Sequence, residues 1–239
     1  MKQVIIILCL LLISCRQENN VVSSENLSQK ASIENRQNSQ ENGDKRHIQF
    51  LFPDSKPTEE EKNSIPDIVK GAITLIASNR EELGKFYDEK ELKIILTKDI
   101  KKVAEQFHVT IPSINGITGI DSFCFDRSVD GKIEYFIILD QRVFDSYMKL
   151  VVTLNYATIY AKNFVNETGK EDFLDQEIKT FKENINDLQD LHNKLTRESN
   201  APQMAEQLKE LKELISKEQD SLKAYQNAKI LNKSAKSTK

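Results

Sequence analysis

Few residues of this chain have both the type and the spacing that enzyme chemistry requires. The histidines are His47, His108 and His192, and no two of them stand at the spacing that places two metal ligands on one helical face. The chain has no P-loop, no nucleophile elbow and no Ser-x-x-Lys accompanied by its partner motifs, and it holds only seven glycines. We therefore expect no catalytic residue, no bound metal and no cofactor.

Four aspartates and one cysteine lie near a predicted turn. Asp121, Asp126, Asp130 and Asp140 flank this turn, but they do not follow the spacing of a calcium-binding loop. Carboxylates beside a turn usually form the turn and stay solvated, so we expect no site there. Cys124 lies between two phenylalanines in a strand-like run without a histidine nearby in sequence. We interpret it as a buried structural thiol rather than a nucleophile.

These residues belong to a mixed pattern of strands and helices. The Asp-Gly pair at 130–131, between apolar runs over 121–127 and 132–139, predicts a β-hairpin. The second strand is apolar on both faces near its end, which is typical of a central strand covered by helices. Residues 141–163 are apolar around most of the helical circumference and predict one long buried helix.

The region before the hairpin contains shorter elements. The first helix has two candidate starts, because Thr58 and Glu61 form a capping box and Ser64 precedes Pro66 at first-turn spacing. The expected elements are an apolar run over 48–52, this helix ending near 78, a strand over 91–97 and a short helix over 99–107.

The C-terminal part has a different periodicity. Apolar residues recur in steps of four and three, which predicts a heptad seam. The seam consists of Leu174, Ile178, Phe181, Ile185, Leu188, His192 and Leu195. It breaks at 199–202 and resumes from Met204 to Leu222, which favours an antiparallel pair of helices. The expected fold class is α+β: a small sheet with a hairpin packed on a long buried helix, followed by a C-terminal antiparallel helical hairpin.

The order strand, hairpin strand, long helix and second helix resembles the core of zincin metallopeptidases over roughly residues 92–185. In that family one helix carries His-Glu-x-x-His, and in the gluzincin branch the next helix supplies a glutamate ligand. The resemblance places Tyr156 and Tyr160 at the two histidine positions. It places Ala157 at the general base and Glu177 at the third ligand. Tyrosine is not an ordinary zinc ligand and alanine accepts no proton, so the resemblance implies an inactive relative.

A second interpretation of the tyrosines needs no such ancestry. Tyr156 and Tyr160 are then large amphipathic side chains packed on one face of a helix.

The first fifteen residues have the layout of a secretory signal. A lysine precedes an apolar run over 4–13, which is too short to span a bilayer. The run ends in Leu-Ile-Ser before Cys15, and this resembles the lipobox of bacterial lipoproteins, whose cysteine is acylated and becomes the mature N-terminus. The resemblance implies export and anchoring to a membrane through lipid on Cys15. The alternative is an ordinary signal peptide with an incidental cysteine.

Composition adds to this resemblance. Charged residues make up 30% of the chain and the formal net charge is −3, which gives no reason to expect a nucleic-acid partner. The Lys-, Asn-, Ile- and Glu-rich composition, together with the export signal, resembles surface lipoproteins of spirochaetes. Arg16 is not the aspartate that retains lipoproteins at the inner membrane of enteric bacteria, so we expect the outer membrane or cell surface.

The expected organisation has five parts. They are a signal peptide (1–14), lipidated Cys15 with a disordered tether (15–47), an α+β domain (48–170), a helical hairpin (171–232) and a disordered basic tail (233–239).

We expect a lipid-anchored, non-catalytic envelope lipoprotein that presents a binding domain to a protein partner or host molecule. One alternative is a metal-dependent peptidase or other hydrolase with an unrecognised site. The other is a structural envelope protein that self-associates through residues 172–232.

Overall fold

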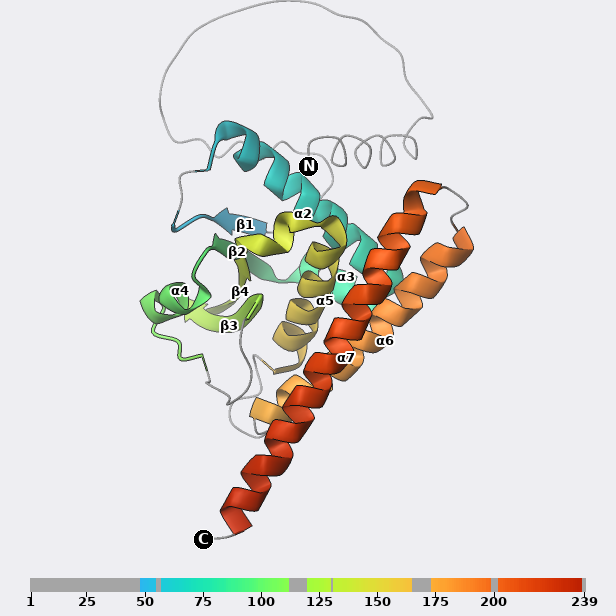
Figure 1. Ribbon diagram of the computed structural model, residues 1–239. Coiled ribbons are helices and arrows are strands. Elements are labelled where there is room, and N and C mark those ends of the chain that lie inside the picture. Colours follow the sequence, from blue (N-terminus) through green and yellow to red (C-terminus); the bar gives the residue numbers. More distant parts are fainter. Residues whose placement is uncertain are drawn as a thin grey trace, which may run out of the picture. The chain divides into compact units, whose positions relative to one another are not determined.

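In the computed structural model, a four-stranded sheet lies on one side of the folded region and the long C-terminal helices lie on the other (Figure 1). The structure describes residues 48–54, 57–111, 120–129, 131–164, 173–198 and 202–237. The predicted signal peptide, Cys15 and the predicted tether lie outside the described residues, as does Asp130.

The sheet has the strand order β1-β2-β4-β3. Its strands are β1 (Ile48–Leu51), β2 (Glu91–Thr97), β3 (Ser122–Val129) and β4 (Lys132–Asp140). The first two strands and β4 run parallel, whereas β3 pairs with β4 antiparallel. The predicted hairpin is confirmed, and Gly131 in its turn adopts a φ of 79°, a backbone conformation that favours glycine. The prediction that the second hairpin strand is central is also confirmed.

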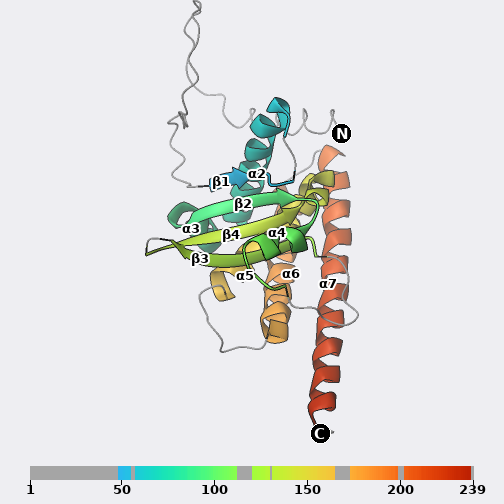
Figure 2. The ribbon, with the colours of Figure 1, turned by 90° about the vertical axis from the view of Figure 1, so that its left-hand side faces the viewer.

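The two faces of the sheet are buried by different elements (Figure 2). Tyr135, Ile137 and Leu139 of β4 face the main core, which α5 (Tyr147–Phe164) and its neighbours cover. The alternate residues Phe136 and Ile138 form a smaller core with α4 (Ile100–Gln106). Because successive side chains of a strand point to opposite faces, the apolar stretch of β4 fills both cores.

The helix α2 (Glu59–Asn79) begins at the capping box. The backbone N–H of Glu61 donates to Thr58 Oγ1 at 3.2 Å, and the Glu61 carboxylate accepts from the Thr58 N–H at 2.8 Å. The alternative start at Ser64 is wrong, because Pro66 lies inside the helix. Proline there removes one helical hydrogen bond, whereas the capping box satisfies donors at the true end.

The next helix, α3 (Glu81–Glu89), was not predicted. It follows α2 after one extended residue, Arg80, which makes no side-chain cap for it. A β-carbon on Gly84 would stand 3.0 Å from the Ala77 β-carbon, so glycine allows α2 and α3 to approach closely.

The long buried helix is present but starts later than expected. Residues Gln141–Asp145 form a 3-10 turn (η1), Ser146 is extended, and only then does α5 begin. The Ser146 hydroxyl accepts from the Lys149 N–H at 3.0 Å and caps the helix. The prediction of one continuous helix from residue 141 is therefore wrong at its start. The extended Ser146 separates the 3-10 turn from α5, and its hydroxyl caps the helix that begins after it.

The C-terminal helices are α6 (Phe173–Glu198) and α7 (Pro202–Ser237). Asn184 contacts Glu218, and further back along α6 Phe181 contacts Tyr225, so the two helices are antiparallel. The predicted fold class is confirmed. Residues 233–237, expected in a disordered tail, continue α7 because no glycine or proline stops the helix.

The buried stripe of α6 differs from the predicted seam. His192 and Ile178 are half-buried, whereas Leu191 is buried. The stripe also contains three buried polar residues, Glu177, Thr180 and Asn184. Ile185, Leu188 and Leu191 share the main core with α5, so the helical hairpin packs directly on the α+β elements. All described elements belong to one compact unit. Among the described residues, no helix is both long and apolar enough to cross a membrane.

Candidate functional site

A cavity of about 510 Å³ lies where the ends of the sheet meet the C-terminal helices. It is bounded by the start of α4, by β3, by the end of β4 and by one face each of α5, α6 and α7. Its volume falls within the range of roughly 300–1,000 Å³ that small-molecule sites occupy. The lining mixes aromatic rings, carboxylates and hydroxyls, so this cavity is the candidate site.

Glu177 of α6 lies between two tyrosines from neighbouring helices. The Tyr156 hydroxyl of α5 donates a hydrogen bond to the Glu177 carboxylate, and Tyr225 of α7 bonds to the same carboxylate. Glu177 is only 7% exposed. Burial raises its pKa to about 7, although both tyrosine hydrogen bonds act to lower it. Proton binding by this carboxyl therefore changes near neutral pH.

Aromatic rings surround this carboxylate. The Phe181 ring stands 4.8 Å from the Tyr156 ring and 5.1 Å from the Tyr225 ring, both at tilted angles. Burial and the nearby negative charge of Glu177 raise the pKa of both tyrosines above its ordinary value, so their hydroxyls stay protonated as donors.

Glu218 of α7 also lines the cavity and is half-buried. Asn184 Nδ2 donates to its carboxylate at 2.8 Å, and Asn155 Nδ2 donates to Asn184 Oδ1 at 2.8 Å. This chain of amides links α5, α6 and α7. Burial raises the pKa of Glu218 to about 7, and the negative charges of Asp121 and Glu177 act in the same direction.

Three positive side chains line the cavity, those of Lys98, Lys101 and Arg142. Arg142 makes two 2.8 Å bonds from its guanidinium to the Asp140 carboxylate and holds the pKa of that carboxyl below its usual range. Lys98 and Lys101 also line the cavity and are exposed. Within the part of the chain that the structure describes, neither Glu177 nor Glu218 forms an ion pair, so both carboxylates lack a positive partner.

The aspartates of the hairpin do not all behave as predicted. Asp121 is exposed and Asp126 is half-buried, as solvated turn residues can be. Asp140 is 5% exposed and accepts from Arg142, so the expectation of a solvated turn carboxylate is wrong for it. The reason is that Asp140 ends β4 next to the core, where Arg142 of η1 bonds to its carboxylate.

Three of the four residues singled out by the zincin resemblance meet in this cavity. Tyr156, Tyr160 and Glu177 all line it, and the Tyr160 hydroxyl donates to Gln176 Oε1 at 3.3 Å. Ala157 is fully buried, and its carbonyl accepts from the Cys124 thiol. Among the described residues no group of three histidine, cysteine or acidic side chains could hold a metal ion.

Cys124 is a buried free thiol on the cavity side of β3. Burial raises the pKa of this thiol far above its ordinary value, so the reactive thiolate is strongly disfavoured. The prediction of a buried structural thiol is confirmed.

Sequence reasoning missed Glu218, Tyr225 and the two asparagines. Glu218 interrupts the apolar residues of the second seam. A usable signal existed, because Glu218 stands between Ile215 and Leu222 at core spacing, as Glu177 does between Leu174 and Phe181. Charged residues at core positions of two paired helices indicate a buried acidic site.

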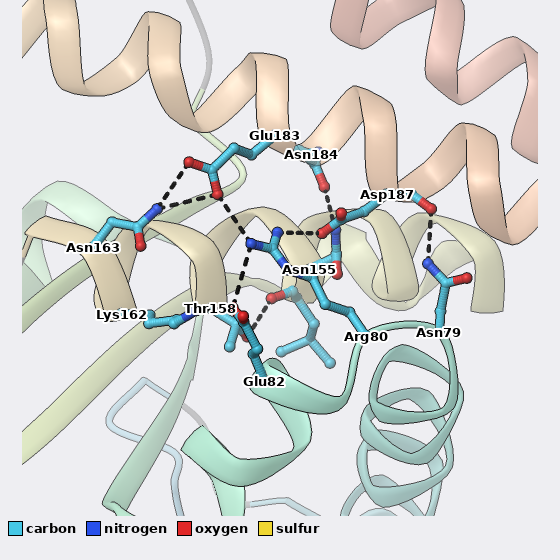
Figure 3. A network of polar contacts seen from close by, with 11 residues as sticks. Asn79, Arg80, Glu82, Asn155, Thr158, Lys162, Asn163, Glu183, Asn184 and Asp187 are labelled. Carbon is cyan, nitrogen blue, oxygen red and sulfur yellow. Dashed lines mark hydrogen bonds and ion pairs between the residues drawn. The ribbon is translucent and has the colours of Figure 1, made fainter.

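A second polar network joins the junction of α2 and α3 to α5 and α6 (Figure 3). Arg80 Nη1 donates to Asp187 at 2.8 Å and Nη2 donates to Glu183 at 3.3 Å. Asn163 of α5 also donates to Glu183, and Asn79 donates to the Asp187 backbone carbonyl. Both acids of α6 have Arg80 as their positive partner, so this network supports the fold rather than a ligand.

No family model, no curated protein and no solved structure matches this chain. The functional argument therefore rests on the sequence and on the geometry of the cavity.

Proposed function

We propose that this chain is a lipid-anchored, non-catalytic lipoprotein of the bacterial envelope whose folded region binds a ligand in the cavity. Anchoring is through Cys15, at the outer membrane or cell surface. The observation that carries the binding role is that the buried carboxylate of Glu177 and the half-buried carboxylate of Glu218 face a cavity of ligand size, and that neither forms an ion pair among the described residues. Buried charge of this kind is costly and is commonly retained for function.

The chemistry of the lining favours binding over turnover. The thiol of Cys124 is held in its unreactive form, and Ala157 stands where the resemblance to zincins would require a general base. The tyrosine hydroxyls are committed as donors to side chains of α6. A site built this way can hold and orient a polar molecule.

The lipid anchor is tested by metabolic labelling with radioactive palmitate in a bacterial host. The wild-type chain is expected to incorporate label and to fractionate with membranes, whereas Cys15→Ala is expected to lose both properties. Cys9→Ala is the matched control, because Cys9 lies inside the predicted signal peptide and leaves with it. Equal labelling of wild type and Cys15→Ala would overturn the anchoring proposal.

The binding role is tested by native mass spectrometry of the chain released from membranes in mild detergent. A non-covalent ligand retained by wild type and lost in Glu177→Gln/Glu218→Gln supports the proposal. A ligand retained equally by both proteins would place binding elsewhere and contradict it.

A hydrolase is the second candidate, and one observation favours it. Two carboxyl groups in one cavity have pKa values of about 7, which suits general acid and base catalysis near neutral pH. Metal analysis and a broad panel of peptide and glycoside substrates distinguish the two functions. Turnover that is lost in both glutamine variants would favour the hydrolase, and absence of turnover favours binding.

The zincin ancestry stays part of the proposal. Its support is that the three positions corresponding to metal ligands, Tyr156, Tyr160 and Glu177, converge on one cavity. The test is a triple replacement, Tyr156→His, Tyr160→His and Ala157→Glu. Stoichiometric zinc uptake by this variant supports a degenerate metal site, and a folded variant without zinc uptake contradicts it.

A protein partner would contact the chain outside the cavity. Ile230 and Leu231 near the end of α7 are 63% and 70% exposed, which is unusual for large apolar side chains of the described residues. Pull-down with wild type and Ile230→Ser/Leu231→Ser tests this, since the partner is expected to be lost from the variant alone.

A further inference from the structure

We infer that the cavity binds a small organic cation carrying a primary ammonium group, with Glu177 and Glu218 as its counter-charges and the aromatic rings of α5, α6 and α7 as its walls. This inference rests on the proposed binding function and names the chemical class of its ligand.

The charge balance of the cavity gives the first argument. Glu177 and Glu218 repel each other, and Asp121 adds further repulsion to Glu218. No ion pair in the described ranges relieves either glutamate, while the arginine of the cavity is already neutralised by Asp140. The missing component is therefore a positive charge, and a bound cation supplies it.

The aromatic walls select the kind of cation. Tyr156, Phe181 and Tyr225 form a contiguous group of tilted rings beside the Glu177 carboxylate. Aromatic faces attract ammonium groups and contact the methylene chain that carries them. Hydrated calcium or magnesium instead requires six or more oxygen ligands, and no metal-holding group of three residues occurs among those described.

An anionic ligand fits this cavity poorly. The cavity already holds the buried carboxylate of Glu177 and the half-buried carboxylate of Glu218, and Asp140 occupies the Nε and Nη2 edge of the Arg142 guanidinium. Lys98 and Lys101 are exposed to solvent, where their charges are screened by water and salt. They do not offset these two carboxylates.

Binding of a cation is linked to release of protons. Among the groups that face Glu177, Tyr156, Tyr160 and Tyr225 have raised pKa values and stay neutral at pH 7, as does Cys124. The Asp140 carboxyl, with its lowered pKa, stays charged beside Arg142. Glu177 and Glu218 are left as the groups that change protonation near neutral pH. An ammonium ion favours their ionised forms, so affinity rises with pH.

The test is isothermal titration calorimetry on the full chain in detergent, with three linear probes of matched length: 1,5-diaminopentane, 1,5-pentanediol and glutarate. Saturable binding of the diamine alone is expected, with an affinity that rises about ten- to a hundredfold from pH 6 to pH 8, for one or two released protons. Calcium and magnesium chloride serve as metal probes and are expected to give no saturable heat.

Variants locate the site. Glu177→Gln/Glu218→Gln is expected to weaken diamine binding at least tenfold and to remove its pH dependence, with a retained cooperative melt. Glu213→Gln, which removes an exposed carboxylate from the same helix α7, is the matched control and is expected to bind as wild type. Equal loss in both variants would contradict the assignment, as would unchanged binding in the double variant.

The outcomes separate the two proposals. Binding of glutarate or pentanediol without binding of the diamine would overturn the cation inference and leave the binding function standing. Absence of binding by every probe, in a chain that also carries no ligand from the membrane, would overturn both.

Discussion

The Tyr156 hydroxyl of α5 donates a hydrogen bond to the Glu177 carboxylate of α6, and this contact joins the central helix to the C-terminal hairpin at the wall of the cavity. Tyr225 of α7 contacts the same carboxylate, so three helices meet at one buried acid. The site therefore depends on how α6 and α7 pack on α5.

Stability is expected to fall as pH rises from about 4.5 to about 7. Glu177 has an ordinary pKa of 4.5 and a folded-state pKa of about 7. A raised pKa in the folded state gives a stability that is full below the unfolded value and is lost as pH rises through the folded value. The loss from Glu177 amounts to at most about 3 kcal/mol.

Urea unfolding at pH 5 and pH 8 measures this loss. Glu177→Gln/Glu218→Gln keeps the hydrogen-bonding shape without the charge, so its stability advantage over wild type is expected to be much larger at pH 8 than at pH 5. A wild-type chain that gains stability between these pH values would contradict the account of the buried acids.

Arg80→Ala is expected to destabilise the fold. The guanidinium is 26% exposed and joins Glu183 and Asp187, which lose their positive partner in the variant (Figure 3). The free energy of unfolding in urea should drop by about 2 kcal/mol. Lys85→Ala, which breaks the exposed pair with Glu81, is the matched control and should cause no measurable change. Equal losses of stability in Arg80→Ala and Lys85→Ala would contradict a stabilising role of the Arg80 network.

Gly84→Val is expected to separate α2 from α3. The Ala77 β-carbon lies 3.0 Å from the position that a β-carbon on Gly84 would take, so the larger side chain has no room. The cost should be about 1–3 kcal/mol, measured by thermal or urea unfolding. Adding Ala77→Gly is expected to restore part of the loss, and a double variant no more stable than Gly84→Val would contradict direct contact as the cause.

Cys124 is expected to resist alkylation in the folded chain and to react once urea unfolds it. The thiol is buried, and its raised pKa disfavours the thiolate. Peptide mapping by mass spectrometry after iodoacetamide treatment measures the modification. Ser128→Cys places a thiol at an exposed position of the same strand and should react rapidly. Comparable rates at both positions in the folded protein would rule out the buried location.

Much of the fold follows from local signals. The Thr58 capping box predicts the start of α2, the Asp-Gly pair predicts the hairpin, and the apolar circumference of residues 141–163 predicts the central helix, which the structure begins at Tyr147. Elements without such signals were missed. The nine residues of α3 have no capping side chain, and the break at Ser146 depends on a single hydroxyl.

The site was less predictable than the fold. Glu177, Tyr156 and Tyr160 were singled out only through a family resemblance. Glu218 and Tyr225 joined them because α7 packs antiparallel on α6 in one register, and that register depends on side-chain packing along the whole hairpin. Core spacing marks Glu218 as a buried position, but no local pattern contains the register between the two helices, since these contacts join separate helices.

The most direct test of the central claim is an NMR titration of the full chain in detergent with 13C-labelled glutamate carboxyl groups. Two carboxyl signals are expected to titrate near pH 7, and they should disappear one at a time in Glu177→Gln and Glu218→Gln. Addition of 1,5-diaminopentane should shift both midpoints to lower pH, because a bound cation favours the ionised acids. Two carboxyls that titrate at the ordinary value of glutamate, with or without the diamine, would contradict a buried acidic binding site.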